Sequence, residues 1–131
     1  MRIVISLILA VGLGANGVWM LTAPASWYGA IPGVAETGPA NMHFVRDLGA
    51  AYLVIAACIS PVVIRSSYGR PAAFASGIFL VLHALVHIWE AAAGRESLYG
   101  LLRDFPGVAL PAILTLWLAW PPDYLRRGVQ K

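Results

Sequence analysis

The stretch AAFASGIFLVLHALVHIWEAAA, residues 72–93, decides the fold class of this 131-residue chain. It holds one acid, Glu90, and two histidines in an otherwise apolar sequence. At about 1.5 Å per residue, a helix of this length rises roughly 33 Å and can cross a hydrocarbon core of roughly 30 Å. The stretch therefore predicts a membrane-spanning helix.

Three further apolar stretches have the same character, at about residues 3–22, 44–64 and 107–120. The last is short, so it needs flanking aromatic side chains in the interfaces or a locally thinner bilayer. We expect a kink near Pro111, because proline cannot donate a backbone hydrogen bond. Together the stretches predict an all-α integral membrane four-helix bundle, with residues 1–131 as a single transmembrane domain.

The composition excludes the main alternatives to a membrane protein. Hydrophobic residues make up 60% of the chain and charged residues 11%, against about 45–50% and about 25% in soluble domains. So few charges cannot cover a soluble globule, and so many apolar residues exclude intrinsic disorder. A single cysteine, Cys58, excludes a disulfide scaffold, and we expect a buried, inert thiol there.

The charges fall unequally on the two sides of the predicted spans. The side with more basic residues carries Arg2, Arg65, Arg70, Arg126, Arg127, Lys131 and the acid Asp123. The other side carries Arg46, Arg95, Arg103, Glu36, Asp47, Glu90, Glu96 and Asp104. By the positive-inside rule, both termini and the 65–70 connection are expected to be cytoplasmic.

The segment 23–42 is long for a connection and is predicted to lie on the outer side. It contains several prolines and glycines together with Trp27 and Tyr28. Loops of this length usually have structure or function of their own. We expect a packed cap on the outer mouth of the bundle with both aromatic residues in the headgroup layer, and a plain connector is the alternative.

Polar residues inside the spans form two helical stripes in the outer half of the membrane. Such residues are costly in a bilayer and therefore informative. The stripes are His43, Arg46 and Asp47 on the second span and His83, His87 and Glu90 on the third. Asn16 and the Tyr52 hydroxyl face the same region. His83 lies about 15 Å inside its helix end, near the midplane, where its ring nitrogens need partners.

Three interpretations of these stripes stay open. They could form a polar clasp that joins the helices through hydrogen bonds. They could bind a small molecule or a lipid headgroup, with Arg46 and the histidines holding an anion or a carbonyl. They could also hold a metal, because His83 and His87 at i and i+4 share a helix face and Glu90, Asp47 or His43 can complete the set.

A glycine pattern in the first span has a structural interpretation. Gly12, Gly14 and Gly17 match the letters of a dinucleotide-binding motif, but they lie inside an apolar helix with no preceding strand. We therefore expect them to allow close helix packing, as small residues do in membrane helices.

The layout resembles the DoxX-like group of small four-helix bacterial membrane proteins. The resemblance rests on the chain length, the segment with prolines and tryptophan after the first span, and an Arg-x-x-Gly-x-x-Tyr-Leu pattern. In this chain that pattern is Arg46, Gly49, Tyr52 and Leu53. Some members are similar to subunits of quinone-linked sulfur oxidation complexes. The resemblance implies a quinone or lipid pocket at the outer helix ends.

The sequence thus favours an inner-membrane protein with a periplasm-facing pocket for a small amphiphile, a quinone or a lipid headgroup. If the protein is an enzyme, proton-coupled redox chemistry suits these side chains best. A non-catalytic subunit of a larger membrane complex and a metal protein using His83 and His87 are the alternatives. Candidate cofactors are a quinone and a divalent metal, and the expected partners are the lipid bilayer and further copies or subunits.

Overall fold

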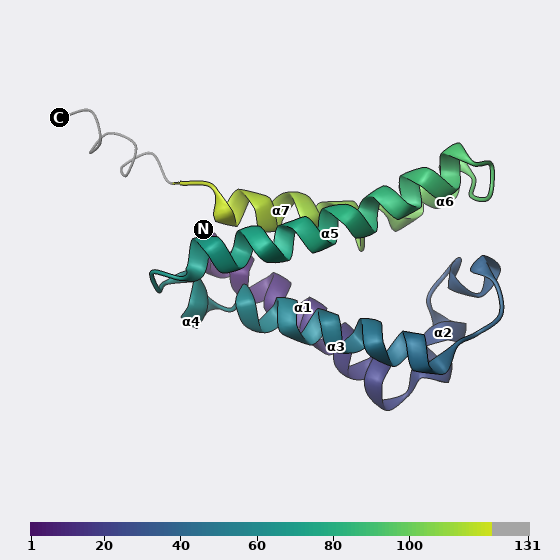
Figure 1. The fold of residues 1–131 in the computed structure, drawn as a ribbon, viewed down its shortest axis with the longest axis horizontal. Helices are drawn as coiled ribbons and strands as arrows, with labels where there is room; N and C mark the ends of the chain where they lie inside the picture. The colour runs from purple at the N-terminus through teal and green to yellow at the C-terminus, as the bar shows by residue number, and fades with distance from the viewer. Residues whose placement is uncertain (122–131) are drawn as a thin grey trace.

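A computed structural model describes residues 1–121, and over this range every regular element is a helix. Two helical hairpins form the fold (Figure 1). The first pairs α1 (Arg2–Thr22) with α3 (Met42–Cys58), and the second pairs α5 (Gly69–Ala92) with α7 (Ala109–Ala119). The shorter elements are α2 (Pro24–Ala30), η1 (Val34–Thr37), α4 (Pro61–Ile64) and α6 (Leu98–Asp104). The prediction of an all-α fold is confirmed for the described residues.

Over the described residues, fewer helices are long and apolar enough to span a membrane than the four that the sequence pattern predicted. By length and hydropathy α1 and α5 can each cross a membrane, and α6 with α7 would add a third span if the bent pair is counted as one. The second helix of the first hairpin, α3, has 17 residues and rises about 25 Å. It falls slightly short of a full hydrocarbon core on its own.

The predicted helix over 44–64 is divided at Pro61. The helix α3 ends at Cys58, and the short helix α4 begins at Pro61. Proline disfavours the helical conformation in the residue before it, and Ser60 is extended, with φ −58° and ψ 154°. Pro61 then occupies the first position of α4, where its missing N–H costs nothing.

Close contact between α1 and α3 depends on glycine. A Cβ atom at Gly17 would lie 2.7 Å from the carbonyl oxygen of Gly49, and one at Gly49 would lie 2.8 Å from the Cβ of Met20. Neither position can hold a side chain while the backbones are this close. The expectation that glycines in the first span serve helix packing is confirmed at Gly17.

The second hairpin contains a sharp bend in the turn directly before Pro111, close to where a kink was expected. The helices α6 and α7 meet at an angle of 47°, and the break covers residues 105–108. Pro111 lies in the first turn of α7, where backbone N–H groups have no intrahelical acceptor. The proline therefore fits into the helix without kinking it.

The segment 23–42 has helical structure of its own and is not a plain connector. It contains α2 and η1, and Trp27 packs into the core with 9% of its surface exposed. The Tyr28 hydroxyl donates a hydrogen bond to the carbonyl of Gly38. Trp27 of α2 is thus buried where the cap meets the rest of the protein, and the place of both aromatic residues in the headgroup layer stays a prediction.

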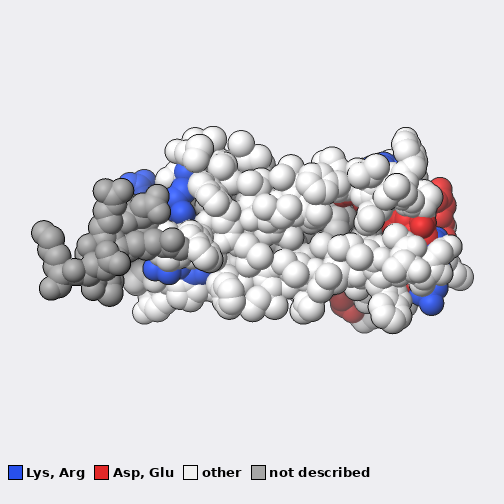
Figure 2. All heavy atoms as spheres, turned by 90° about the horizontal axis from the view of Figure 1, so that it is seen from above, with Lys and Arg blue, Asp and Glu red and all other residues white. Residues whose placement is uncertain are grey.

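The charged side chains gather at the two ends of the molecule, with a long uncharged belt between them (Figure 2). At one end, Arg2 donates to the carbonyls of Leu118 and Trp120, and Arg70 Nε lies 3.2 Å from the Ala119 oxygen. The beginnings of α1 and α5 therefore meet the end of α7. The hairpins diverge from this end toward α2 and α6 (Figure 1). The other charged residues that we assigned to the cytoplasmic side after the last span lie outside the described residues: Asp123, Arg126, Arg127 and Lys131.

Candidate functional site

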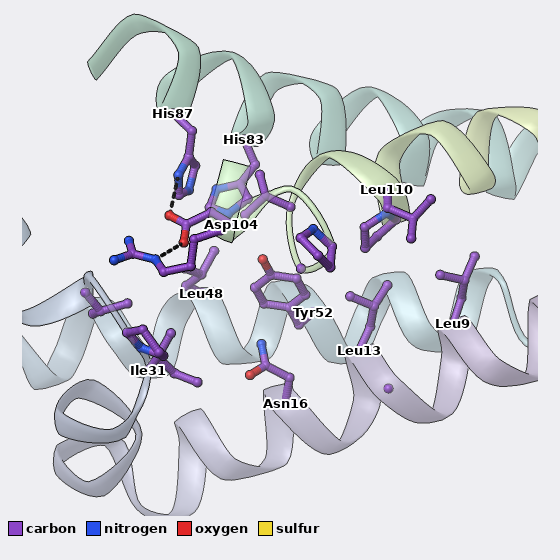
Figure 3. A pocket seen from close by; sticks show the side chains of 18 of the residues that line it. Leu9, Leu13, Asn16, Ile31, Leu48, Tyr52, His83, His87, Asp104 and Leu110 are labelled. Atoms are coloured by element: carbon purple, nitrogen blue, oxygen red, sulfur yellow. Dashed lines mark hydrogen bonds and ion pairs between the residues drawn. The ribbon is translucent and has the colours of Figure 1, made fainter. Parts of the chain in front are cut away.

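A cavity of about 570 Å³ lies between the diverging hairpins. Its walls come from α1, α3, α5, α6 and α7, together with α2 and the chain that follows it (Figure 3). The apolar part is formed by Leu9, Leu13, Leu110 and Leu114. The polar part is formed by Asn16, Tyr52, His83, His87, Arg103 and Asp104. The cavity is therefore amphipathic, with its polar groups on the side of the acidic end.

Two aromatic contacts hold the histidines of α5 in place. The rings of His83 and His87 lie edge to face with centroids 5.1 Å apart, and Tyr52 meets His83 in the same manner at 6.2 Å. Only 5% of the Tyr52 surface is exposed. Within residues 1–121 neither the Tyr52 hydroxyl nor the His83 ring forms a hydrogen bond with protein groups, so both can serve a ligand in the cavity.

Asn16 joins the site from α1 and is fixed by the cap. Its side-chain oxygen accepts a 2.8 Å hydrogen bond from Trp27 Nε1, and its amide nitrogen lies 3.6 Å from the Met20 sulfur. Sulfur is a weak acceptor. The amide therefore keeps donor capacity at the cavity wall.

An ionic cluster closes the polar end. His87 Nδ1 lies 3.4 Å from Asp104 Oδ2 and 3.7 Å from Glu96 Oε2. Arg103 Nε donates to Asp104 Oδ1 at 2.8 Å, and Arg103 Nη2 lies 3.4 Å from Glu96 Oε1. These side chains are 19–25% exposed. The cluster is therefore partly shielded from solvent.

A tight turn and a glycine bring the cluster together. After α5, Gly94 takes a left-handed φ of 71°, and the backbone N–H groups of Arg95 and Glu96 return to the Glu90 carbonyl. This turn places Glu96 beside the end of α5. On the opposite side Gly33, with φ 84°, approaches Arg103 so closely that a Cβ atom would overlap the guanidinium.

Several residues predicted for the site lie away from the cavity. His43 and Asp47 form a pair with each other at 3.4 Å and are largely exposed, and Arg46 Nε reaches the Leu21 carbonyl at 3.4 Å. At about 100° per residue, Arg46 and Asp47 lie about 120–140° around α3 from Tyr52, and His43 lies about 180° away. These three residues do share one face of α3, but that face is turned away from the cavity.

Glu90 also has a different partner from the one predicted. Its Oε1 atom accepts from Arg95 Nη1 at 2.8 Å. The metal set of His83, His87 and Glu90 is therefore not assembled in this structure. The carboxylates near His87 are those of Glu96 and Asp104.

Sequence reasoning counted Glu96, Arg103 and Asp104 only as outer-side charges. Their role depends on the turn after α5 and on the orientation of α6, which Ser97 caps through its hydroxyl and the Gly100 N–H. One feature of the sequence could have pointed to them. Residues 96–104 hold three charged residues in nine positions, in a chain that is 11% charged.

Comparisons with known proteins do not extend this description. The chain matches no family model, and it is similar to no curated protein and no solved structure. The function must therefore be argued from the cavity and its residues.

Proposed function

We propose that this chain is a multi-pass protein of the bacterial cytoplasmic membrane and that its cavity binds a small amphiphile, with a quinone as the best fit. The observation that carries the proposal is the cavity itself. Its apolar part adjoins a cluster of hydrogen-bonding side chains between two helical hairpins. Its volume lies within the range of about 300–1,000 Å³ that is typical of small-molecule sites.

The proposed membrane arrangement has four crossings with both termini in the cytoplasm. It is supported by two helices of sufficient length, by the bent α6–α7 pair, and by the antiparallel pairing of α3 with α1. Arginines at the end near α4 and acids at the end near α6 agree with the positive-inside rule (Figure 2). Exposed apolar residues such as Val11, Leu82 and Val86 would then face lipid.

The choice of a quinone rests on the chemistry of the polar part. Tyr52, Asn16 and the histidines can donate hydrogen bonds to carbonyl oxygens without carrying a net charge. The leucines of the apolar part suit an isoprenoid tail. The resemblance to the DoxX-like group supports the same choice.

An anionic lipid headgroup fits less well. Arg103, which lines the polar part of the cavity, is already paired with Glu96 and Asp104. One positive and two negative charges leave the cluster at −1 while His87 is neutral. A phosphate would be repelled by this charge.

Binding of a short-chain benzoquinone tests the proposal. We expect the purified protein in mild detergent to bind decyl-benzoquinone saturably, followed by quenching of the tryptophan fluorescence, to which Trp27 at the cavity wall contributes. Tyr52→Phe removes one hydrogen bond, so Kd should rise about three- to tenfold.

A space-filling variant provides the control for the site. A Cβ at Gly12 meets nothing within 4 Å and Gly12 lines the cavity, so Gly12→Phe should fill the apolar part and abolish binding. The matched variant Gly29→Phe, also at an unobstructed glycine, should bind as the wild type does. Absence of saturable binding, or equal binding in Gly12→Phe, would refute the pocket and favour a non-catalytic subunit.

A further inference from the structure

The ligand atoms of His87, Glu96 and Asp104 lie within 4.8 Å of one another. We propose that they form a binding site for a divalent first-row transition metal ion at the polar end of the cavity. The ligands would be His87 Nδ1, Glu96 Oε2 and Asp104 Oδ2. The site differs from the set of His83, His87 and Glu90, because both carboxylates come from the segment around α6.

The distances suit a shared ion better than direct hydrogen bonds. His87 Nδ1 lies 3.4 and 3.7 Å from the two carboxylate oxygens, whereas N–H···O bonds to carboxylates measure about 2.7–2.9 Å. Two tetrahedral ligands at about 2.0–2.1 Å from a zinc ion lie about 3.4 Å apart. The two distances from His87 Nδ1 are therefore close to those between ligands of one ion, and all three ligand atoms lie within 4.8 Å of one another.

Arg103 orients the carboxylates for this role. It holds Asp104 Oδ1 and Glu96 Oε1, so the second oxygen of each carboxylate is the one that faces His87. Hydrogen bonds to the far side of ligating groups are common at metal sites and fix the ligands in position. Arg103 also lowers the charge repulsion between the two acids when no ion is bound.

The donor set defines the class of metal. One imidazole nitrogen and two carboxylate oxygens suit Zn²⁺, Mn²⁺ or Fe²⁺, while Ca²⁺ prefers six to eight oxygen ligands and Cu⁺ prefers sulfur. Three protein ligands leave at least one coordination position for water or another small molecule. His87 and Asp104 line the cavity, so the ion would lie beside it.

Titration of metal-free protein with zinc chloride tests the site. We expect one equivalent to bind, and we expect Glu96→Gln, Asp104→Asn and His87→Gln each to weaken binding at least tenfold. Glu90→Gln and His43→Gln serve as matched controls because both residues pair elsewhere, and they should leave the affinity unchanged. Stoichiometric binding that is unaltered in Glu96→Gln would overturn the proposal.

Cobalt binding to the unmodified protein keeps the test decisive where a variant fails to fold. We expect one equivalent of Co²⁺ to give visible absorption stronger than that of aqueous cobalt, because the ion leaves octahedral geometry. Zn²⁺ should abolish that absorption. A cobalt spectrum identical to that of the free ion at saturating protein would overturn the proposal. The metal test requires no quinone, so a negative result leaves the proposed quinone binding untouched. In the same way, a failure to bind quinone leaves the proposed metal site untouched.

Discussion

At the scale of single residues, the bond between Trp27 and Asn16 connects the cap to the cavity wall. Trp27 comes from α2 and Asn16 from α1, and their hydrogen bond measures 2.8 Å with Trp27 almost fully buried. Since a buried polar group without a partner is costly, the bond keeps the cap closed over the polar end of the cavity.

Trp27→Phe tests this connection. The variant keeps most of the apolar surface but leaves the Asn16 oxygen without its donor, so we expect a loss of about 0.5–1.5 kcal/mol in the free energy of unfolding. Thermal unfolding in detergent, followed by circular dichroism, measures it. Trp89→Phe, at a 67% exposed position, is the control, and an equal loss in both variants would contradict the argument.

Single residues of the site were predictable only where helical periodicity decides their position. A spacing of i, i+4 places His83 and His87 on one face of a helix wherever that helix lies. Glu96 and Asp104 could not be assigned in this way. Their approach to His87 depends on the left-handed turn at Gly94 and on the direction in which α6 leaves it.

At the scale of elements, the contact between α1 and α3 depends on the absence of side chains at two positions. A Cβ at Gly17 would meet the backbone oxygen of Gly49. Unlike the tip of a flexible side chain, this backbone atom cannot move aside without shifting a helix.

Gly17→Val should therefore separate the helices of the first hairpin. Overpacking of this kind costs about 1–3 kcal/mol in the free energy of unfolding, measured as a lower midpoint of thermal unfolding in detergent. Gly12→Ala, on the same helix with nothing within 4 Å of the added carbon, should retain the wild-type midpoint. A wild-type midpoint in Gly17→Val would show that the helices are not in close contact in solution.

Helix existence was predictable from hydropathy, and helix ends were less so. The apolar stretch 44–64 has no charged residue after Asp47, so its hydropathy gives no reason to end a helix at Cys58. The end is caused by Pro61, which forces Ser60 out of the helical region. Likewise a kink was predictable near Pro111, but not that the break would cover 105–108 and leave Pro111 in the first turn of α7, where a proline removes no bond.

At the scale of the whole molecule, the separation of charges toward two ends gives the proposed orientation a direct test. In a Cys58→Ser background, Thr37→Cys places a thiol on the cap and Ser67→Cys places one in the connection before α5. We expect a membrane-impermeant thiol reagent to label Thr37→Cys in intact cells and Ser67→Cys only after permeabilisation. The reverse pattern would place the cap in the cytoplasm.

The arrangement of the two hairpins was the least predictable feature. Composition and hydropathy predict apolar helices, but they do not say how two hairpins tilt against each other. The tilt follows from particular contacts, with Arg2 of the first hairpin bonded to the end of α7 in the second, and with the cap and α6 lying at the opposite end. It is this divergence that leaves room for the cavity.

The pairing of the helices also has a consequence for biogenesis. Each long helix packs mainly against its neighbour along the chain, α1 against α3 and α5 against α7. The first hairpin can therefore assemble in the membrane while the ribosome is still translating the second, as N-terminal units generally do. The Arg2 contacts with Leu118 and Trp120 can form only after the second hairpin has been synthesised. The cavity is lined by residues of both hairpins, so it forms only after both have been made and have come together.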